Sequence, residues 1–442
     1  MGGGRSSASG ARTISRALSR PVLSRFGGGS SSVSPTITWS VDENAYVPTA
    51  TTTSPDLFVG FNNAWWAAGT SALFVDIDGV GPTLNLYDVG GATTALGRVS
   101  GGLARAATAT DASGRVLVVR VTPGDEVVVQ DSDDAFATET VVSDATHTGC
   151  TEVGVVFTPT GAIAFWTADQ GVFFAWYTNL YGGSAAAAWW PAQAIDDGGA
   201  SGTQSFPSVA VSGDGDLNLE GPVVLFVWRG DSGGGVANIY ARATTEYLLR
   251  KGTLSVEGGV GIPSVWGDPD QSTGVVALTS SGTGEDSRDP CVWCTPEGRF
   301  WVGYSYQASI RSGALAYVLD CSAPAHGGTW SGPASMDTTN VRLTQNFVNG
   351  HCDTTAGYAI AVWEYGNSNR DGGKQAWGAW LDLNDASATW QPFNESLSAE
   401  PETEIATLPT VWVNPDGTFL LAYIWESATP AFAVRVRIGT PT

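Results

Sequence analysis

The stretch "VWCTPEGRFWVGY" (292–304) shows the pattern on which the fold of this chain is built. It consists of a short apolar segment, a Thr-Pro-Glu-Gly quartet and a second apolar segment rich in aromatic residues. Proline presets the first dihedral angle of a tight turn, and glycine accepts a positive φ at low cost. The stretch therefore predicts an antiparallel hairpin that turns at Pro296 and Gly298.

The same plan recurs along the chain. Close copies are "VVFTPTGAIAFW" (155–166) and "VWVNPDGTFLLAY" (411–423), and weaker copies are "AATATDASGRVLVV" (106–119) and "GHCDTTAGYAIAVW" (350–363). A period of about 45–60 residues, built from three or four antiparallel strands, is typical of a β-propeller blade. We therefore predict an all-β fold, a β-propeller.

Seven repeats can be counted, so we favour seven blades, with six or eight as alternatives. The expected modules are 50–100, 101–149, 150–200, 204–262, 289–340, 343–403 and 407–442. The stretch 263–288 does not fit the repeat, and we interpret it as an insertion or a fragment of a further blade. The last module holds only three strands, and "PTITWSV" (35–41) is expected to supply its outer strand and close the ring.

The composition excludes several classes of partner. Asp and Glu number 43 against 21 Lys and Arg, which gives a formal net charge of −22. Such a body repels nucleic acid and anionic membrane surfaces, so neither is an expected partner. No apolar run reaches the roughly 18 residues of a membrane span.

Two stretches carry a family resemblance. "NDASATW" (384–390) and "AHGGTW" (325–330) resemble degenerate Asp-box turns of the sialidase-like propellers, whose pattern is Ser-x-Asp-x-Gly-x-Thr-Trp. Asp385, Thr389 and Trp390 fit the pattern, whereas the first copy lacks the glycine and the second lacks the aspartate. The resemblance supports the propeller architecture more than it supports an activity.

A sialidase-like enzyme would need an arginine cluster that binds a carboxylate, an acidic Asp and a Tyr–Glu nucleophile pair. The arginines available are Arg229, Arg242, Arg288, Arg299, Arg311 and Arg342. None lies in a recognisable family motif, and scattered arginines in a propeller more often form hydrogen bonds between blades. We therefore predict no catalytic residue.

Metal and redox sites are weakly indicated. The two cysteines of "CVWC" (291–294) are three apart in a strand, so they face opposite sides of the sheet and do not chelate together. We expect five buried free thiols, no metal site and no cofactor. The acidic loops 213–222 and 266–274 leave calcium as an alternative, although neither has EF-hand spacing.

Two adjacent tryptophan pairs are candidate contact residues for a glycan or a protein: Trp65 with Trp66, and Trp189 with Trp190. Neighbours in a strand point to opposite faces, so one member of each pair is exposed unless another surface covers it. An exposed Trp offers a large, rigid area for sugar stacking or protein contact. The alternative, that both members pack between blades, stays open.

The segment "ARTISRALSRPVLSRFGGG" (11–29) has the opposite charge to the body. The first 40 residues hold five Arg and no acidic residue. Arginines at a spacing of four share one face of a short helix, with apolar residues on roughly the opposite face. The expected docking residues are Arg12, Arg16, Arg20, Arg25, Ile14 and Leu18.

Three interpretations of this segment compete: a mitochondrial transit peptide, an idle tail, and a docking peptide that orders on a partner. Because the chain begins with the segment, we expect it to be retained, and we favour docking. We thus expect residues 1–34 to form an extended or short-helical anchor and residues 35–442 to form the propeller.

This organisation resembles the appendage proteins of tailed-bacteriophage particles, in which a Gly/Ser-rich anchor fixes a β-rich body to the virion. The leading hypothesis is a non-enzymatic virion protein present in several copies, which docks to other assembly proteins and displays a surface for a host glycan or receptor. The alternative is a secreted or cell-surface carbohydrate-active propeller, either a sialidase-like glycosidase or a lectin. A scaffold in a host complex is a third possibility.

Overall fold

The computed structural model describes residues 36–46, 71–78, 81–88, 93–98, 106–111, 113–169, 171–178, 187–196, 202–213, 221–231, 236–249, 266, 272–309, 314–337, 344–366, 373–398, 405–426 and 432–442. All of them belong to one compact unit of the chain, Ser34–Thr442. The expected docking segment 1–34 and Trp65 and Trp66 lie outside the described residues. Within them, no helix is long and apolar enough to cross a membrane.

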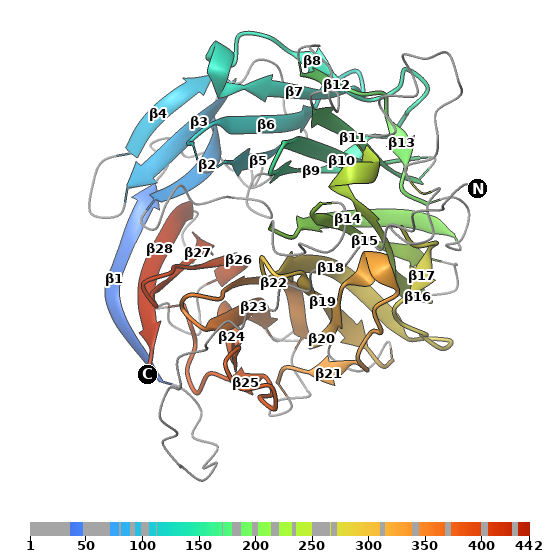
Figure 1. Ribbon diagram of the computed structural model, residues 1–442. Helices are drawn as coiled ribbons and strands as arrows, with labels where there is room; N and C mark the ends of the chain where they lie inside the picture. The colour runs from blue at the N-terminus through green and yellow to red at the C-terminus, as the bar shows by residue number, and fades with distance from the viewer. Residues whose placement is uncertain are drawn as a thin grey trace, which may run out of the picture. The chain divides into compact units, whose positions relative to one another are not determined.

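The protein is an all-β propeller, as predicted, and its described strands form six hydrogen-bonded sheets (Figure 1). The eight-stranded sheet holds two antiparallel blades joined by one parallel pair, Ala237 with Asp286, so the six sheets correspond to seven blades. Blade 1 comprises β2 (Ser71–Asp78), β3 (Gly81–Asp88) and β4 (Thr93–Arg98). Blade 2 comprises β5 (Ala106–Thr110), β6 (Val116–Val121), β7 (Val127–Asp131) and β8 (Thr140–Val141). Blade 3 comprises β9 (Thr151–Thr158), β10 (Gly161–Ala168), β11 (Gly171–Thr178), β12 (Ala188–Trp189) and β13 (Gln193–Ala194).

The remaining four blades repeat this meander. Blade 4 comprises β14 (Thr203–Val211), β15 (Val223–Asp231), β16 (Ala237–Thr245) and β17 (Val276–Ala277). Blade 5 comprises β18 (Asp286–Cys294), β19 (Arg299–Gln307), β20 (Leu315–Ser322) and β21 (Ala334–Ser335). Blade 6 comprises β22 (Thr344–Asp353), β23 (Tyr358–Gly366), β24 (Lys374–Asp382) and β25 (Gln391–Pro392). Blade 7 comprises β26 (Ile405–Val413), β27 (Phe419–Glu426), β28 (Phe432–Pro441) and β1 (Ile37–Tyr46).

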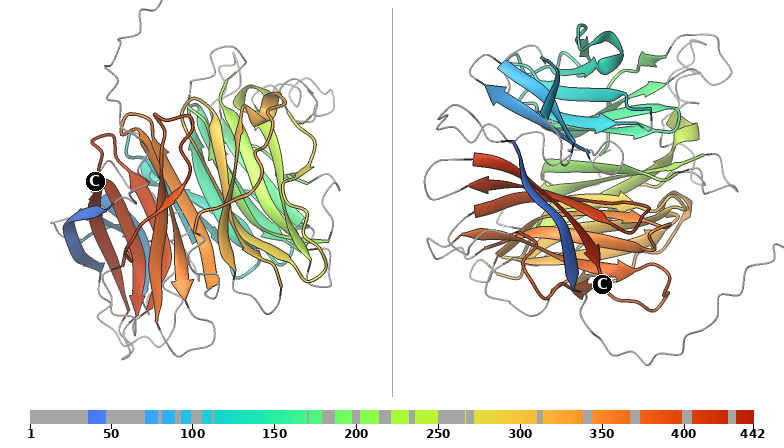
Figure 2. Two further views of the ribbon diagram at one scale, coloured as in Figure 1. Left: turned by 90° about the horizontal axis from the view of Figure 1, so that it is seen from below. Right: turned by 90° about the vertical axis from the view of Figure 1, so that its left-hand side faces the viewer.

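Blade 7 is completed from the other end of the described chain. β1 pairs antiparallel with β28, from Ile37 opposite Pro441 to Tyr46 opposite Val434. Thr36 and Thr442 extend the ladder through two backbone hydrogen bonds of 3.1 and 2.8 Å. Figure 2 shows β1 lying along the outer side of this sheet.

The blades follow one another through their first strands. In chain order, β2 contacts β5, β5 contacts β9, β9 contacts β14, β14 contacts β18, β18 contacts β22, and β22 contacts β26. Each blade therefore presents its first strand toward the neighbouring first strands, and its fourth strand lies at the outer edge (Figure 1). Residues at equivalent positions in the first strands are consequently brought near one another, although the starts of successive first strands are 35 to 83 residues apart in the sequence.

The predicted hairpins are confirmed in all five copies. In four of them the turn glycine adopts a positive φ, at 88° for Gly114, 87° for Gly298, 82° for Gly357 and 85° for Gly417. Gly161 differs, because it already pairs with Thr158 in the ladder. A Cβ on Gly161 would lie 1.8 Å from the Tyr177 carbonyl oxygen, so close backbone approach explains this glycine.

The described residues of the stretch 263–288, which are 266 and 272–288, include parts of blades 4 and 5, and this corrects the expectation of an insertion or an extra blade fragment. Residues 276–277 form β17, the outer strand of blade 4, and β18 of blade 5 already begins at Asp286. An outer strand that pairs through only two residues leaves too short a pattern for recognition in the sequence. The module expected to end at residue 262 therefore continues to β17.

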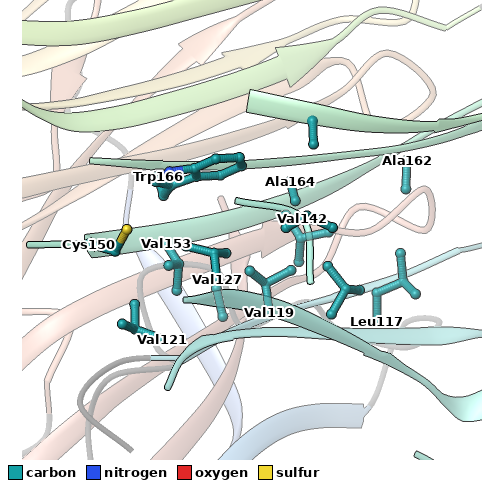
Figure 3. Packing of buried hydrophobic residues seen from close by; sticks show 14 of the residues in the cluster. Leu117, Val119, Val121, Val127, Val142, Cys150, Val153, Ala162, Ala164 and Trp166 are labelled. Atoms are coloured by element: carbon teal, nitrogen blue, oxygen red, sulfur yellow. The ribbon is translucent and has the colours of Figure 1, made fainter. Parts of the chain in front are cut away.

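The core lies between successive blades. Between blades 2 and 3, for example, Leu117, Val119 and Val127 face Ala162 and Trp166 across the gap between the sheets (Figure 3). A blade with a neighbour on each side needs apolar residues on both of its faces, because both faces are covered. This explains why the chain holds so much apolar and aromatic material and so few charged residues.

Candidate functional site

Five consecutive blades interrupt their first strand with the same irregularity. In blades 3 to 7, two residues of the first strand lie opposite one residue of the second strand, which is the definition of a β-bulge. We call these the central bulges; they comprise residues 152–153, 206–207, 289–290, 347–348 and 408–409.

The residue opposite each central bulge is a buried aromatic side chain. These side chains are 2% exposed or less: Trp166, Trp228, Tyr304, Trp363 and Tyr423. A large ring at this position fills the core between blades and keeps the second strand straight while the first strand bends. The bulge is therefore a repeated structural device, and it re-aims the side chains of the first strand at the same depth in each blade.

The first residue of every central bulge has an unfavourable backbone conformation. Their φ angles lie between 49° and 53°: Glu152, Phe206, Asp289, Phe347 and Leu408. Such angles in non-glycine residues cost of order 1–3 kcal/mol and concentrate at functional sites. Only nine non-glycine residues of the described chain have positive φ, and five of them occupy this one position. The central bulges are therefore the candidate functional region.

Glu152 links the bulge of blade 3 to the bulge of blade 4. Its Oε2 accepts a hydrogen bond of 2.7 Å from the backbone N–H of Phe206 and one of 2.9 Å from the Thr167 hydroxyl. A carboxylate that accepts two such bonds is held in one orientation. Glu152 thus has a fixed position beside the first strand of blade 4.

Asp289 is the acidic residue of the bulge in blade 5. Partial burial raises the pKa of its carboxyl to about 6, and the nearby Asp286 and Glu152 carboxylates act in the same direction. Arg288 and Arg229 oppose this rise. Among the described residues, no hydrogen-bond donor contributes to the pKa of this carboxylate. Asp289 therefore has the burial and charge environment of an acid–base group.

The contacts between first strands fix where the site lies. Glu152 belongs to β9 of blade 3 and Asp289 to β18 of blade 5, and β14 of blade 4 contacts both strands. The hydrogen bond from the backbone of Phe206 to Glu152 spans the first of these two contacts. Both carboxyl groups therefore belong to first strands, on the inner side of blades 3 to 5.

Two arginines accompany the carboxylates. Arg229 Nη2 lies 3.3 Å from Asp231 and 3.4 Å from Asp286. Arg288 Nε lies 3.3 Å from Asp286, and its Nη2 donates to the side chain of Gln307. Asp286 therefore holds both guanidinium groups together beside Asp289. Both guanidinium groups are thus paired with carboxylates, and four carboxyl groups accompany the two arginines: Asp231, Asp286, Asp289 and Glu152.

The other arginines considered from the sequence have structural roles or lie elsewhere. Arg242 donates to the Ile195 carbonyl at 2.9 Å and lies over the ring of Trp266, whereas Arg299 pairs with Asp320 at 2.8 Å. Arg311 and Arg342 lie outside the described residues. The sequence therefore offered six candidate arginines, and only the folded structure shows that Arg229 and Arg288 lie together beside Asp289.

The tryptophan pair Trp189–Trp190 divides as strand geometry predicts. Trp189 packs against the cluster between blades 2 and 3, near Tyr177, and Trp190 packs against the cluster between blades 3 and 4. Both are partly buried. Both side chains thus pack between blades, which is the alternative considered from the sequence. A contact of either one with a glycan stays a prediction.

The cysteines of "CVWC" also divide between two faces. Cys291 packs against the cluster between blades 5 and 6 and Cys294 against the cluster between blades 4 and 5. Burial raises the pKa of both thiols, to about 11 for Cys291 and about 12 for Cys294. All five cysteines are free, and no group of three or more His, Cys, Asp or Glu in the described part of the chain is placed to hold a metal ion.

The sequence analysis did not single out Glu152 and Asp289 as candidate residues, although a signal was present. The stretches "FPSVAVS" (206–212), "DPCVWCT" (289–295) and "LPTVWVN" (408–414) share a proline at their second position. The copies of the repeat recognised in the sequence begin two residues after this proline, at Val292 and Val411. Extending each copy by three residues toward the N-terminus places Asp289 and Leu408 at the same position of the repeat.

Comparison with known proteins supports the fold. No family model matches the chain, and no curated protein matches it. Among solved structures, an ulvan lyase described as a new family of polysaccharide lyase, PL25, matches with a TM-score of 0.51 at 8% identity, over 90% of this chain and 94% of that chain. Its complex with -[GlcA(1-4)Rha3S]- matches with the same TM-score. Polysaccharide lyase Uly1 matches with a TM-score of 0.50 at 8% identity, over 86% and 90% of the two chains.

These matches correct the leading hypothesis from the sequence. The chain shares its fold along nearly its whole length with polysaccharide lyases, and nothing in the comparisons supports a bacteriophage or virion protein or a sialidase Asp-box. The virion interpretation is therefore wrong as the leading one. It rested on the residues before position 35, whereas the comparisons and the central bulges concern the propeller.

Proposed function

We propose that the protein is an extracellular carbohydrate-active enzyme that cleaves a polysaccharide bearing carboxylate groups. The observation that carries this proposal is the central bulge of blade 5, which brings Asp289 beside Arg229 and Arg288 and within electrostatic range of Glu152. A guanidinium group carries five N–H donors, so Arg229 and Arg288 can donate to a substrate carboxylate while they stay paired with Asp231 and Asp286. An acid–base group beside such donors matches a substrate with a carboxylate near the bond to be broken.

The fold neighbours favour elimination as the reaction. The ulvan lyase was solved with a ligand containing GlcA, an acidic sugar, and lyases cleave such polymers without water. In β-elimination, a base removes the proton from the carbon next to the substrate carboxylate. The electron pair of that C–H bond becomes a C=C bond, and the bond from the β carbon to the bridging oxygen breaks.

Each residue of the cluster has a role in this scheme. Asp289 in its charged form takes the proton, and Arg229 and Arg288 stabilise the negative charge that develops on the substrate carboxylate. The protonated Asp289 then returns the proton to the leaving oxygen. Glu152 is held in place by the Phe206 backbone and the Thr167 hydroxyl, beside the first strand of blade 4.

A glycosidase is the second candidate, because one observation favours it. Glu152 and Asp289 are two carboxyl groups at equivalent positions of two blades, and paired carboxyl groups with different pKa values are the usual machinery of glycoside hydrolysis. Hydrolysis and elimination leave different products, so one assay separates them.

The test is incubation of the full-length protein with ulvan, polygalacturonate and alginate, and with neutral arabinan and xylan. A lyase produces an ultraviolet absorbance from the new C=C bond together with reducing ends, whereas a glycosidase produces reducing ends alone. We expect both signals on an acidic polymer and none on the neutral ones. Absence of turnover and of binding on every polymer would overturn the proposal.

The matched variants are Asp289→Asn and Asp385→Asn. Asp289→Asn removes the acid–base group and is expected to lower the rate by at least about 100-fold. Asp385 is an exposed turn residue whose Oδ1 accepts from Ser387 at 2.8 Å, so its variant controls for loss of one surface charge. Equal activity of the two variants would exclude Asp289 from the reaction.

A further inference from the structure

Aromatic side chains occupy the first bulge position on both sides of Asp289. Phe206 holds that position in blade 4 and Phe347 holds it in blade 6, and blade 5 with Asp289 lies between them. Along the central bulges of blades 3 to 7, the series is Glu152, Phe206, Asp289, Phe347 and Leu408. An acid flanked by two aromatic rings is therefore built from three equivalent positions.

Phe206 and Phe347 keep part of their surface exposed, and neither is among the residues of the core clusters that the structure describes. The buried rings opposite the bulges, such as Trp228 and Trp363, pack between the blades. A large apolar side chain that stays outside the core and is held in a costly backbone conformation calls for a functional explanation.

Flat apolar rings beside charged groups match the surface of a sugar. A pyranose ring exposes C–H bonds on its faces and hydroxyl or carboxylate groups at its rim. An aromatic side chain covers the C–H face with a large, rigid area, and nearby charged residues contact the rim. In blade 4, Glu152 Oε2 bonds to the backbone of Phe206 itself, so a rim contact and a face contact lie at one bulge.

We propose that Phe206 and Phe347 stack against two sugar rings on either side of the scissile bond, so that the bond lies over Asp289. This inference rests on the proposed function and adds to it the position of the chain across blades 4 to 6. It requires at least two linked sugar units for full affinity, because each ring covers only one of them.

The test measures binding in the Asp289→Asn background, in which the sugar is not consumed. Titration calorimetry with a monosaccharide, a disaccharide and a tetrasaccharide of the acidic polymer found in the activity screen gives the affinities. We expect the affinity for the disaccharide and the tetrasaccharide to fall roughly 5- to 50-fold in each of Phe206→Leu and Phe347→Leu, since leucine keeps apolar bulk but offers no flat ring. Phe206→Trp and Phe347→Trp keep a flat ring and should retain the affinity of the Asp289→Asn protein.

Phe157→Leu is the matched control. Phe157 lies in β9, outside the central bulges, and packs against the core between blades 2 and 3. This variant makes the same substitution and should leave the disaccharide affinity unchanged. If Phe157→Leu lowers that affinity as much as the Phe206 and Phe347 variants do, the effect comes from the loss of any aromatic ring of the propeller and the stacking inference fails.

The outcomes separate this inference from the function on which it rests. If the protein binds and cleaves an acidic polymer while both Phe→Leu variants bind the disaccharide normally, the stacking inference is wrong and the function stands. If the unmodified protein neither binds nor cleaves any glycan, the proposed function fails and the inference with it. Melting curves of each variant show whether a loss of affinity reflects a loss of fold.

Discussion

Glu152 Oε2 accepts a 2.7 Å hydrogen bond from the backbone N–H of Phe206, and this bond joins the first strands of two neighbouring blades. Both residues are the first residue of a central bulge. The bulge removes Phe206 from the ladder of its own blade, since the pairing between β14 and β15 skips from Ser205 to Ser208. Glu152 therefore supplies the acceptor that the ladder no longer provides.

The first prediction concerns this bond. Glu152→Ala leaves the N–H of Phe206 without its acceptor, and we expect the free energy of unfolding to fall by about 1–3 kcal/mol. Glu152→Gln keeps a side-chain oxygen and should cost less. Urea unfolding of the unmodified protein and the two variants measures these free energies. If Glu152→Ala unfolds with the same free energy as the unmodified protein, the hydrogen bond contributes nothing to stability.

The second prediction concerns the stability cost of Asp289. Its pKa in the folded protein, about 6, lies above the usual 3.8, so folding favours the protonated form. Its contribution to stability is present below about pH 4 and is lost as the pH rises through about 6. Asp289→Asn removes this cost and should stabilise the protein at pH 8 by of order 1–3 kcal/mol, with little effect at pH 4. Thermal unfolding at the two pH values measures it.

For Asp385, the effect of the Asp→Asn substitution on stability is expected to have the opposite sign, so this residue serves as the comparison. Hydrogen bonds from the Ser387 side chain and backbone lower the pKa of Asp385, so its stabilising contribution is present at neutral pH and is lost on acidification. Asp385→Asn should therefore destabilise the protein at pH 8. A destabilised Asp289→Asn at that pH would contradict the environment assigned to Asp289.

The third prediction concerns Arg229. Its positive charge lowers the pKa of Asp289, so Arg229→Gln should shift that pKa upward. If Asp289 acts as the base, the rate rises with pH through its pKa, and the variant should show this rise at higher pH. Loss of one cation should also lower the maximal rate by roughly 100-fold. A pH–rate profile with an unchanged midpoint would exclude the coupling between Arg229 and Asp289.

The fourth prediction concerns acid sensitivity at a distance from the site. His351 Nδ1 accepts a 3.0 Å hydrogen bond from the backbone N–H of Val413, and its ring stacks on Trp412 at 3.7 Å. Burial lowers the pKa of His351 to about 3, so the neutral ring is the folded form. Its contribution is present above about pH 6.5 and is lost as the pH falls toward 3. His351→Gln should flatten the fall of the melting temperature across that interval, and an unchanged slope would refute the assignment.

Local sequence determined the repeating part of this protein. The Pro-x-Gly turns, the apolar alternation and the aromatic residue near the end of the second strand predict hairpins, and their period predicts blades. The hairpins at Gly298 and Gly417 follow the prediction because turn chemistry and strand patterning act over a few residues. The outer strand β17 escaped prediction because two paired residues leave no periodic signal.

The candidate site was decided only by the tertiary structure. Glu152 and Asp289 are 137 positions apart in the sequence, and Arg229 resembles any other arginine of the chain until the blades assemble. What brings these residues together is the succession of first strands, each with a bulge at the same depth. That arrangement depends on packing between blades, which is a long-range property. The sequence therefore determined the blade, whereas the assembly of blades determined where the charged and aromatic side chains meet.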